Sequence, residues 1–179
     1  ENINVVTPSH VMPHILKALM LAAEDGLQLP LVYNCGGYES LEALKVLDGV
    51  VDIYMPDMKY GTDESGLKYS GVKDYAKRNR AAVREMHRQV GDLQVGPDGV
   101  ATRGLLVRHL VLPGGLAGTE EAMRFLAEEI SRDTYVNIMK QYYPAYRADR
   151  YPELNRRVTE DEFRAAVRTA VKMGLRRVQ

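Results

Sequence analysis

The sequence has almost no cysteine, since Cys35 is the only one among 179 residues. One thiol cannot form a disulfide within the chain, and it cannot complete an all-cysteine zinc or iron-sulfur centre. A fold stabilised by internal disulfides is therefore excluded. Any all-cysteine metal centre would need ligands from outside this chain.

Net charge and long apolar runs are also missing. Twenty-four basic and 24 acidic residues give zero formal charge, which removes the overall attraction that nucleic acid or an anionic membrane would need. No apolar run approaches the roughly 18 residues of a membrane span, and the N-terminus lacks the basic-then-apolar order of a secretory signal. We therefore expect a soluble, cytoplasmic protein that binds neither nucleic acid nor membrane.

What the chain does contain is an alternation of short β-branched runs with longer segments of helical period. This alternation is typical of β/α units that carry a parallel sheet. For 179 residues, 45% of them hydrophobic, we expect one domain over 1–179, with β/α units over 1–140 and a tyrosine-rich loop and C-terminal helix over 141–179. The predicted strands are 3–6, 31–34, 51–55, 105–112, 135–139 and a short final one at 175–178.

Local signals predict where helices and turns lie between these strands. Helix starts are expected at Ser9, Ser40, Asp74, Thr119 and Thr159, the last with Glu162 as its capping-box partner. Three glycines, Gly61, Gly66 and Gly71, predict a loop before Asp74, and 97–99 predicts a turn that could close a hairpin. Each helix has apolar residues expected on one face: Val11, Met12, Ile15, Leu16, Leu19 and Ala23 in the first; Leu41, Leu44 and Leu47 in the second; Ala76, Val83, Met86 and Val90 in the helix from Asp74; Ala122, Met123, Leu126 and Ile130 in the helix from Thr119; and Phe163, Ala166, Val167, Ala170 and Val171 in the last.

The fold class predicted is α/β, as a partial (β/α) barrel of mainly parallel strands or an open sheet. A closed barrel of eight units needs about 250 residues, more than the chain has. In parallel β/α folds, ligands bind at the C-terminal ends of the strands. The positions to consider are therefore Thr7, 34–38, 57–60, the end of the strand that contains Arg108, and 140–142.

Asp57 and Lys59 stand out at one of these strand ends. Side chains alternate along a strand, so the two share one face. A carboxylate and an ammonium so placed could bind opposite ends of a zwitterion. The alternative is a structural or solvated ion pair worth about 0 to 1 kcal/mol.

Arg108 and His109 are neighbours on a strand and must face opposite sides of the sheet. Only one of them can serve a ligand site, and we favour Arg108. An arginine within a run of leucine and valine must find a partner or a ligand, because an unpaired buried charge costs several kcal/mol. Structural pairing with an acidic neighbour is the alternative.

Other polar positions carry weaker signals. Asn34 begins a glycine turn after a strand, where backbone amides could approach a ligand. Cys35 has no histidine near it in sequence, so a buried thiol is favoured over a nucleophile. His10 and His14 lack a third metal ligand, which favours a solvated face. The tyrosines of 141–155 could stack on a planar ligand, cover the mouth of a site or pack as a loop.

The strand-end residues together resemble a known family. Tyr-Asn-Cys-Gly-Gly-Tyr at 33–38, Asp-Ile-Tyr-Met-Pro-Asp-Met-Lys-Tyr at 52–60, Tyr-Ser-Gly at 69–71, Val-Arg-His-Leu-Val-Leu-Pro-Gly at 107–114 and Ile-Met-Lys-Gln-Tyr at 138–142 resemble the radical S-adenosylmethionine proteins related to pyruvate formate-lyase activating enzyme. The resemblance covers nearly the whole chain, and it is closer to an uncharacterised iron-sulfur branch of that family.

The resemblance implies a half-barrel to which this chain supplies the later strands, and S-adenosylmethionine as cofactor. Asp57 and Lys59 would contact its amino acid and ribose parts, and Arg108 would line the same cleft. Asn34 stands where the activating enzymes often have an aspartate, and Tyr142 lies near the position of a histidine in relatives. The CxxxCxxC loop that holds the family's 4Fe-4S cluster and the Gly-Gly-Glu segment are absent, so we expect a C-terminal portion of a longer enzyme, inactive by itself.

The resemblance also implies an activity and partners. In the full-length form we expect a radical S-adenosylmethionine oxidoreductase or activase that uses a 5′-deoxyadenosyl radical for hydrogen abstraction. Its partners would be a glycyl-radical enzyme or another protein substrate, and an electron donor such as flavodoxin or ferredoxin. A stand-alone nucleotide-binding module without redox chemistry and a β/α lyase using Lys59 remain alternatives. As a fragment, the chain would expose strand 3–6 as an unpaired edge and self-associate weakly.

Overall fold

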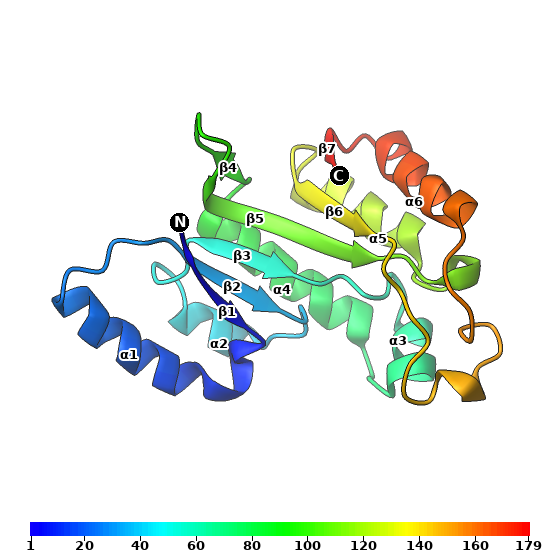
Figure 1. The fold of residues 1–179 in the computed structure, drawn as a ribbon, viewed down its shortest axis with the longest axis horizontal. Helices are drawn as coiled ribbons and strands as arrows, with labels where there is room; N and C mark the ends of the chain where they lie inside the picture. Colours follow the sequence, from blue (N-terminus) through cyan, green and yellow to red (C-terminus); the bar gives the residue numbers. More distant parts are fainter.

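The computed structural model describes residues 1–179 and contains one curved sheet of seven strands (Figure 1). The strand order is β1-β2-β3-β5-β6-β7, and all neighbours in this order are parallel. The short β4 pairs antiparallel with β5. The strands are β1 (Ile3–Val6), β2 (Leu31–Cys35), β3 (Ile53–Pro56), β4 (Gln94–Val95), β5 (Ala101–Leu110), β6 (Tyr135–Met139) and β7 (Arg177–Val178). The α/β class with a parallel sheet, as in a partial barrel, is confirmed.

The helices are unevenly distributed over the two faces of the sheet. The main core has 26 buried residues and draws on side chains from the sheet and from every helix except α3. The opposite face has a small cluster of three buried residues, Val32, Ile53 and Leu93, with no helical member. We call this the helix-free face. The helices are α1 (Met12–Glu24), α2 (Leu41–Val46), α3 (Asp63–Ser70), α4 (Tyr75–Val90), α5 (Thr119–Phe125) and α6 (Glu160–Lys172).

Helix α3 lies where the glycines predicted a loop, and that prediction was wrong. Thr62 caps the helix by accepting a hydrogen bond from the Ser65 amide, and Gly71 ends it in the left-handed conformation. Gly66 lies inside the helix. A Cβ at this position would lie 2.5 Å from the Tyr75 side chain, so there is room only for glycine. The glycine that suggested flexibility therefore permits close packing of α3 on α4.

Helix α1 is the second correction. Of its predicted face, Met12, Leu16 and Leu19 pack partly buried against the main core, but Val11 and Ala23 are exposed and no residue of α1 is fully buried. Ser9 does not cap it: residues Pro8–Val11 form a 3-10 turn, and the Ser9 hydroxyl donates to Glu39. Neighbouring β1 forms an edge of the sheet with no partner on its outer side. Self-association through this edge stays a prediction.

The C-terminal region follows its local signals closely. Strand β6 has the predicted bounds, and Thr159 and Glu162 form the predicted capping box at the start of α6. The predicted face of α6 is correct for Ala166 and Ala170 but wrong for Val171, which is exposed. Between β6 and α6 the chain is irregular except for a 3-10 turn at Ala148–Arg150. None of the helices combines the length and apolarity needed to cross a membrane.

Candidate functional site

Asp57, Lys59 and Arg108 meet where β3 and β5 end. Asp57 follows β3 directly and pairs with Arg108 of β5 in an isolated parallel bridge. One Asp57 carboxylate oxygen accepts from Arg108 Nε at 2.8 Å and lies 2.6 Å from Nη2, and the other accepts from Lys59 Nζ. The Asp57 and Arg108 side chains are 16% and 24% exposed, whereas Lys59 is 45% exposed. The cluster is thus open to solvent on one side.

The charges of this cluster do not cancel. Two cations share one carboxylate, and no other acidic side chain forms an ion pair with Lys59 or Arg108. A guanidinium has five N–H donors and an ammonium has three, so several remain free to bind a carboxylate or another anion. Each Asp57 oxygen retains acceptor capacity for an amino or hydroxyl group. The arrangement therefore suits a ligand with both an anionic and a donor group.

Helix α4 holds the end of β3 in place through a buried amide. Asn79 Nδ2 donates to the carbonyl oxygens of Gly37 at 2.8 Å and Asp57 at 2.9 Å, which ties the turn after β2 to the site. Gly37 has φ +73°, and a Cβ there would lie 2.2 Å from the Asp57 carbonyl oxygen. Only glycine fits this approach. The glycine turn singled out in the sequence thus positions Asp57 from the neighbouring strand.

Arg108 and His109 face opposite sides, as predicted. His109 is fully buried among the helices, where Nδ1 lies 2.7 Å from the Met58 carbonyl oxygen and Nε2 lies 2.9 Å from the Thr119 hydroxyl. The carbonyl must accept, so Nδ1 carries the proton and neutral Nε2 accepts from Thr119. Burial lowers the pKa of His109 to about 4. His109 is a structural residue, and Arg108 alone reaches the site.

The structure separates the two remaining sequence candidates. Asn34 pairs with Met55 in the register of β2 and β3, on the helix-free face, and its side chain makes no hydrogen bond. It therefore lies on the same face as the charged cluster without contacting it. The Tyr142 hydroxyl instead donates to the Leu154 carbonyl oxygen at 3.0 Å, within the tyrosine-rich loop. Tyr142 makes no hydrogen bond to the cluster.

Two contributors, Asn79 and Tyr75, were not found from the sequence. Tyr75 Oη accepts from the Lys59 amide at 2.9 Å, and burial raises the pKa of this phenol. Asn79 follows Ala76 by three residues and precedes Val83 by four, so it lies on the buried face of α4. A polar residue on a predicted apolar face was the signal available.

The chain has no set of residues that could hold an iron-sulfur cluster. Cys35 is buried, which raises the pKa of its thiol. No group of three or more His, Cys, Asp or Glu side chains is placed to hold a metal ion. The residues of this chain therefore do not fit an iron-sulfur cluster.

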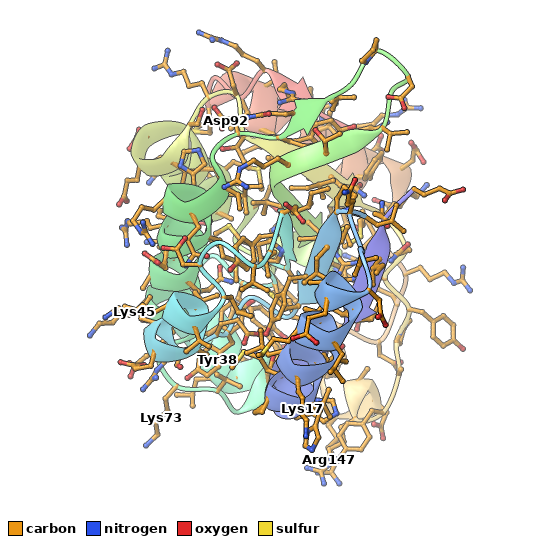
Figure 2. All side chains as sticks on the ribbon, turned by 90° about the vertical axis from the view of Figure 1, so that its left-hand side faces the viewer. Lys17, Tyr38, Lys45, Lys73, Asp92 and Arg147 are labelled. Carbon is orange, nitrogen blue, oxygen red and sulfur yellow. The ribbon has the colours of Figure 1, made fainter.

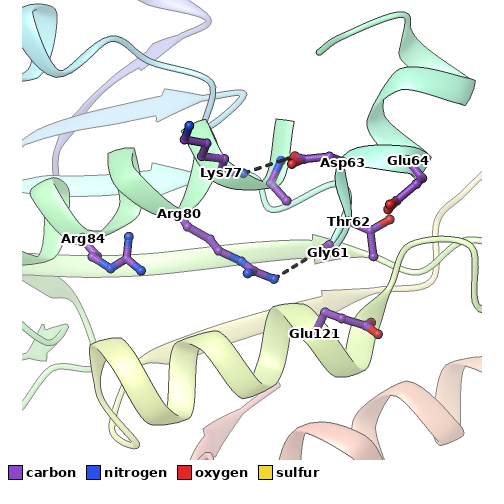
Figure 3. Close-up of a pocket in the computed structure, with 9 residues that line it drawn as sticks. Gly61, Thr62, Asp63, Glu64, Lys77, Arg80, Arg84 and Glu121 are labelled. Carbon is purple, nitrogen blue, oxygen red and sulfur yellow. Dashed lines mark hydrogen bonds between the residues drawn. The ribbon is translucent and has the colours of Figure 1, made fainter. Parts of the chain in front are cut away.

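A hollow separate from the charged cluster lies among the helices. It has a volume of about 470 Å³ and is bordered by α3, α4 and α5 (Figure 3). Three basic side chains, Lys77, Arg80 and Arg84, face it, but so do three acidic ones, Asp63, Glu64 and Glu121. Several are engaged within the protein: Arg80 donates to the Gly61 carbonyl oxygen, and Asp63 accepts from two α4 amides. This hollow has no excess of either charge with which to select an ion.

Comparisons with known proteins agree with the fold. No family model matches the chain. An uncharacterised protein of Methanocaldococcus jannaschii is 33% identical, over 98% of this chain and 47% of that protein, so the chain spans about half the length of the curated relative it matches. The crystal structure of a domain of pyruvate-formate lyase-activating enzyme from Bacteroides vulgatus is similar over all of this chain and 96% of that one, with a TM-score of 0.67 and 11% identity. At that identity the likeness shows the fold, which is the half-barrel that the sequence predicted.

Proposed function

We propose that this chain is the S-adenosylmethionine-binding part of a radical S-adenosylmethionine enzyme of the pyruvate formate-lyase activating type. The observation that carries the proposal is the Asp57, Lys59 and Arg108 cluster, with one carboxylate between two cations at the strand ends. The similarity of the fold to an activating-enzyme domain supports it. The match to an uncharacterised protein adds no activity.

The cluster fits the amino acid end of S-adenosylmethionine. Arg108 and Lys59 have free donors for its carboxylate, while Asp57 can accept from its amino group or from a ribose hydroxyl. One-electron reduction of the bound S-adenosylmethionine, by a centre whose ligands lie outside this chain, would break its bond from sulfur to the 5′ carbon and give methionine and a 5′-deoxyadenosyl radical for hydrogen abstraction. The residues of this chain would hold the molecule, fix its orientation and keep water from the reacting carbon.

The lyase alternative is less well supported by the geometry. A Schiff-base lysine must be a neutral amine to attack a carbonyl. Lys59 is 45% exposed and paired with the Asp57 carboxylate, whereas an activated amine is desolvated in an apolar pocket or placed beside another cation. Borohydride trapping with a carbonyl substrate would detect such chemistry directly, and labelling of Lys59 would overturn the proposal.

Calorimetric titration of the full-length protein with S-adenosylmethionine tests the binding. Arg108→Gln and Asp57→Asn should each weaken binding at least about tenfold, because each removes a charge-assisted hydrogen bond. Arg124→Gln is the matched control, since Arg124 pairs with Glu120 on the exposed side of α5. Equal affinity in all three variants would contradict the proposal.

An anaerobic assay of the full-length protein for 5′-deoxyadenosine separates the enzyme from a binding module. We expect product only when Asp57 and Arg108 are both intact. If the protein bound S-adenosylmethionine but formed no 5′-deoxyadenosine in a preparation with an intact iron-sulfur cluster, the enzyme hypothesis would fail and a binding module would be the remaining interpretation.

A further inference from the structure

A tyrosine-lined cavity lies beside the charged cluster, beyond the ends of β3, β5 and β6. Its volume is about 170 Å³, and nine of its ten lining residues are apolar or aromatic. Tyr60 follows Lys59 directly, and Leu112 and Tyr142 lie just beyond β5 and β6. The tyrosine-rich loop closes the other side with Ala145, Tyr146, Arg147, Ala148, Tyr151 and Leu154, and Tyr69 completes the wall.

Helix α3 holds this loop in place, so the cavity is already formed. Lys68 of α3 pairs with Glu153 at 2.7 Å, and the Tyr151 hydroxyl donates to the Lys68 carbonyl oxygen at 3.0 Å. The rings of Tyr69 and Tyr151 meet edge to face with centroids 5.3 Å apart. These contacts join segments more than 80 residues apart in the chain. A ligand would meet a wall that needs little rearrangement.

The interior of the cavity presents ring surfaces rather than free hydroxyls. Four wall tyrosines have their hydroxyl groups hydrogen-bonded within the protein: Tyr60 with Ser70, Tyr69 with Glu153, Tyr142 with the Leu154 carbonyl oxygen, and Tyr151 with the Lys68 carbonyl oxygen. Polar groups that are already paired gain little from a ligand. The part of a ligand that enters should therefore be apolar.

The size of the cavity limits that part to about one ring. An apolar cavity of about 150 Å³ accepts benzene, whereas pockets for whole drug-sized ligands have about 300 Å³ or more. A nucleoside is too large to enter. The cavity is therefore distinct from the place proposed for S-adenosylmethionine, although the two share one edge of the sheet.

Arg147 supplies the charge at the mouth. It lines the cavity, its guanidinium lies 4.9 Å from the centre of the Tyr146 ring, and no carboxylate forms an ion pair with it. Tyr146 is 88% exposed. Figure 2 shows Arg147 at the outer limit of the molecule, with its polar end toward solvent. A stacked, unpaired arginine beside an aromatic cavity is suited to an anionic group.

We propose that this cavity binds the aromatic ring of an organic anion whose carboxylate or phosphate pairs with Arg147. Because Tyr60 in the cavity wall directly follows Lys59, the proposal makes that anion the substrate, or the side group of a substrate, of the site at the strand ends. This assignment as substrate rests on the proposed function, but binding of the ring and the anion does not.

The test is calorimetric titration of the full-length protein with four probes. Phenylacetate and phenyl phosphate carry both a ring and an anion, whereas benzyl alcohol has only the ring and inorganic phosphate only the anion. We expect the first two to bind at least about tenfold more tightly than the last two, since each partial probe lacks one of the two contacts. A preference between the first two identifies the anion.

The matched variants are Arg147→Gln and Arg150→Gln. Both arginines are exposed and lack an ion pair, but only Arg147 lines the cavity. Arg147→Gln should weaken phenylacetate binding about tenfold, and Arg150→Gln should leave it within about twofold. Equal binding of ring-bearing and ringless anions, equal effects of the two variants, or no binding at millimolar concentration would each overturn the proposal.

A further variant separates this inference from the proposed function. Arg108→Gln should lose S-adenosylmethionine affinity and keep phenylacetate affinity, while Arg147→Gln should do the reverse. Loss of both affinities in Arg108→Gln would show that the two places are one site.

Discussion

The two faces of the sheet differ in how many side chains they bury and in how their polar groups are paired. On one face, helices bury a core of 26 residues, and His109, one of several buried polar side chains there, has both nitrogens hydrogen-bonded. On the helix-free face, the buried apolar cluster has only three residues and a charged cluster remains open to solvent. Arg108 and His109 show the contrast within two adjacent residues. Stability comes mainly from the face that the helices cover. The helix-free face can therefore keep hydrogen-bond donors of Lys59 and Arg108 available for a ligand.

The largest expected effect comes from an adjacent pair on β5. Leu105 is completely buried in the main core, whereas Leu106 packs against the small cluster of the helix-free face and is only partly buried. Leu105→Ala should lower the free energy of unfolding by about 2–5 kcal/mol, because it leaves a cavity. Leu106→Ala should cost about 1 kcal/mol. Urea unfolding compares them, and equal losses would mean that both faces are packed alike.

The pH dependence of stability tests His109. Its pKa is about 4 in the fold and about 6.5 in an unfolded chain. The unfolded chain therefore takes up a proton first, so stability is complete above about pH 6.5 and falls as the pH drops toward 4, by up to about 3 kcal/mol. Unfolding measured from pH 7 to 4.5 should show this fall. In His109→Gln, which keeps a donor and an acceptor but cannot be protonated, the fall should be much smaller; an unchanged slope would assign it to other groups.

Substitutions of Gly37 and Gly36 test how Asp57 is held in position on the helix-free face. Gly37→Ala adds a Cβ 2.2 Å from a backbone oxygen at φ +73°, whereas Gly36→Ala meets open space. The first should cost about 2 kcal/mol, from strain and overpacking, and should also weaken ligand binding by displacing Asp57. The second should leave the free energy of unfolding within about 0.5 kcal/mol of its starting value. Thermal unfolding and titration of both variants check this, and similar behaviour would argue against the close approach.

The sequence predicted those parts of the fold that depend on neighbouring residues. The bounds of β6 follow from a short run rich in β-branched residues, and the start of α6 follows from Thr159 and Glu162, which lie one helical turn apart. The opposite facing of Arg108 and His109 follows from strand geometry alone. Asp57 and Lys59 were brought together by the same alternation.

What could not be predicted depends on contacts between distant segments. Gly66 suggested a loop, and only the packing of Tyr75 against it explains why glycine occurs within a helix. Asn79 joins Gly37 and Asp57 across separations of 42 and 22 residues. A periodic apolar pattern also cannot tell how completely other elements cover it, which is why the predicted face of α1 packs on the main core but is only partly buried.

The smallest expected effect on the free energy of unfolding comes from helix α1, whose outer side is exposed although the helix belongs to the layer that covers the main core. It belongs to the helical layer, since Leu16 and Leu19 pack on the main core, but Met20 is 68% exposed. Met20→Lys should change the free energy of unfolding by less than about 0.5 kcal/mol, because the substitution touches solvent and both residues favour helices. Leu16→Lys, which places an ammonium against the core, should cost several times more. A loss of about 2 kcal/mol or more for Met20→Lys in urea unfolding would mean that another surface covers α1, and the helical layer would then have a second buried side.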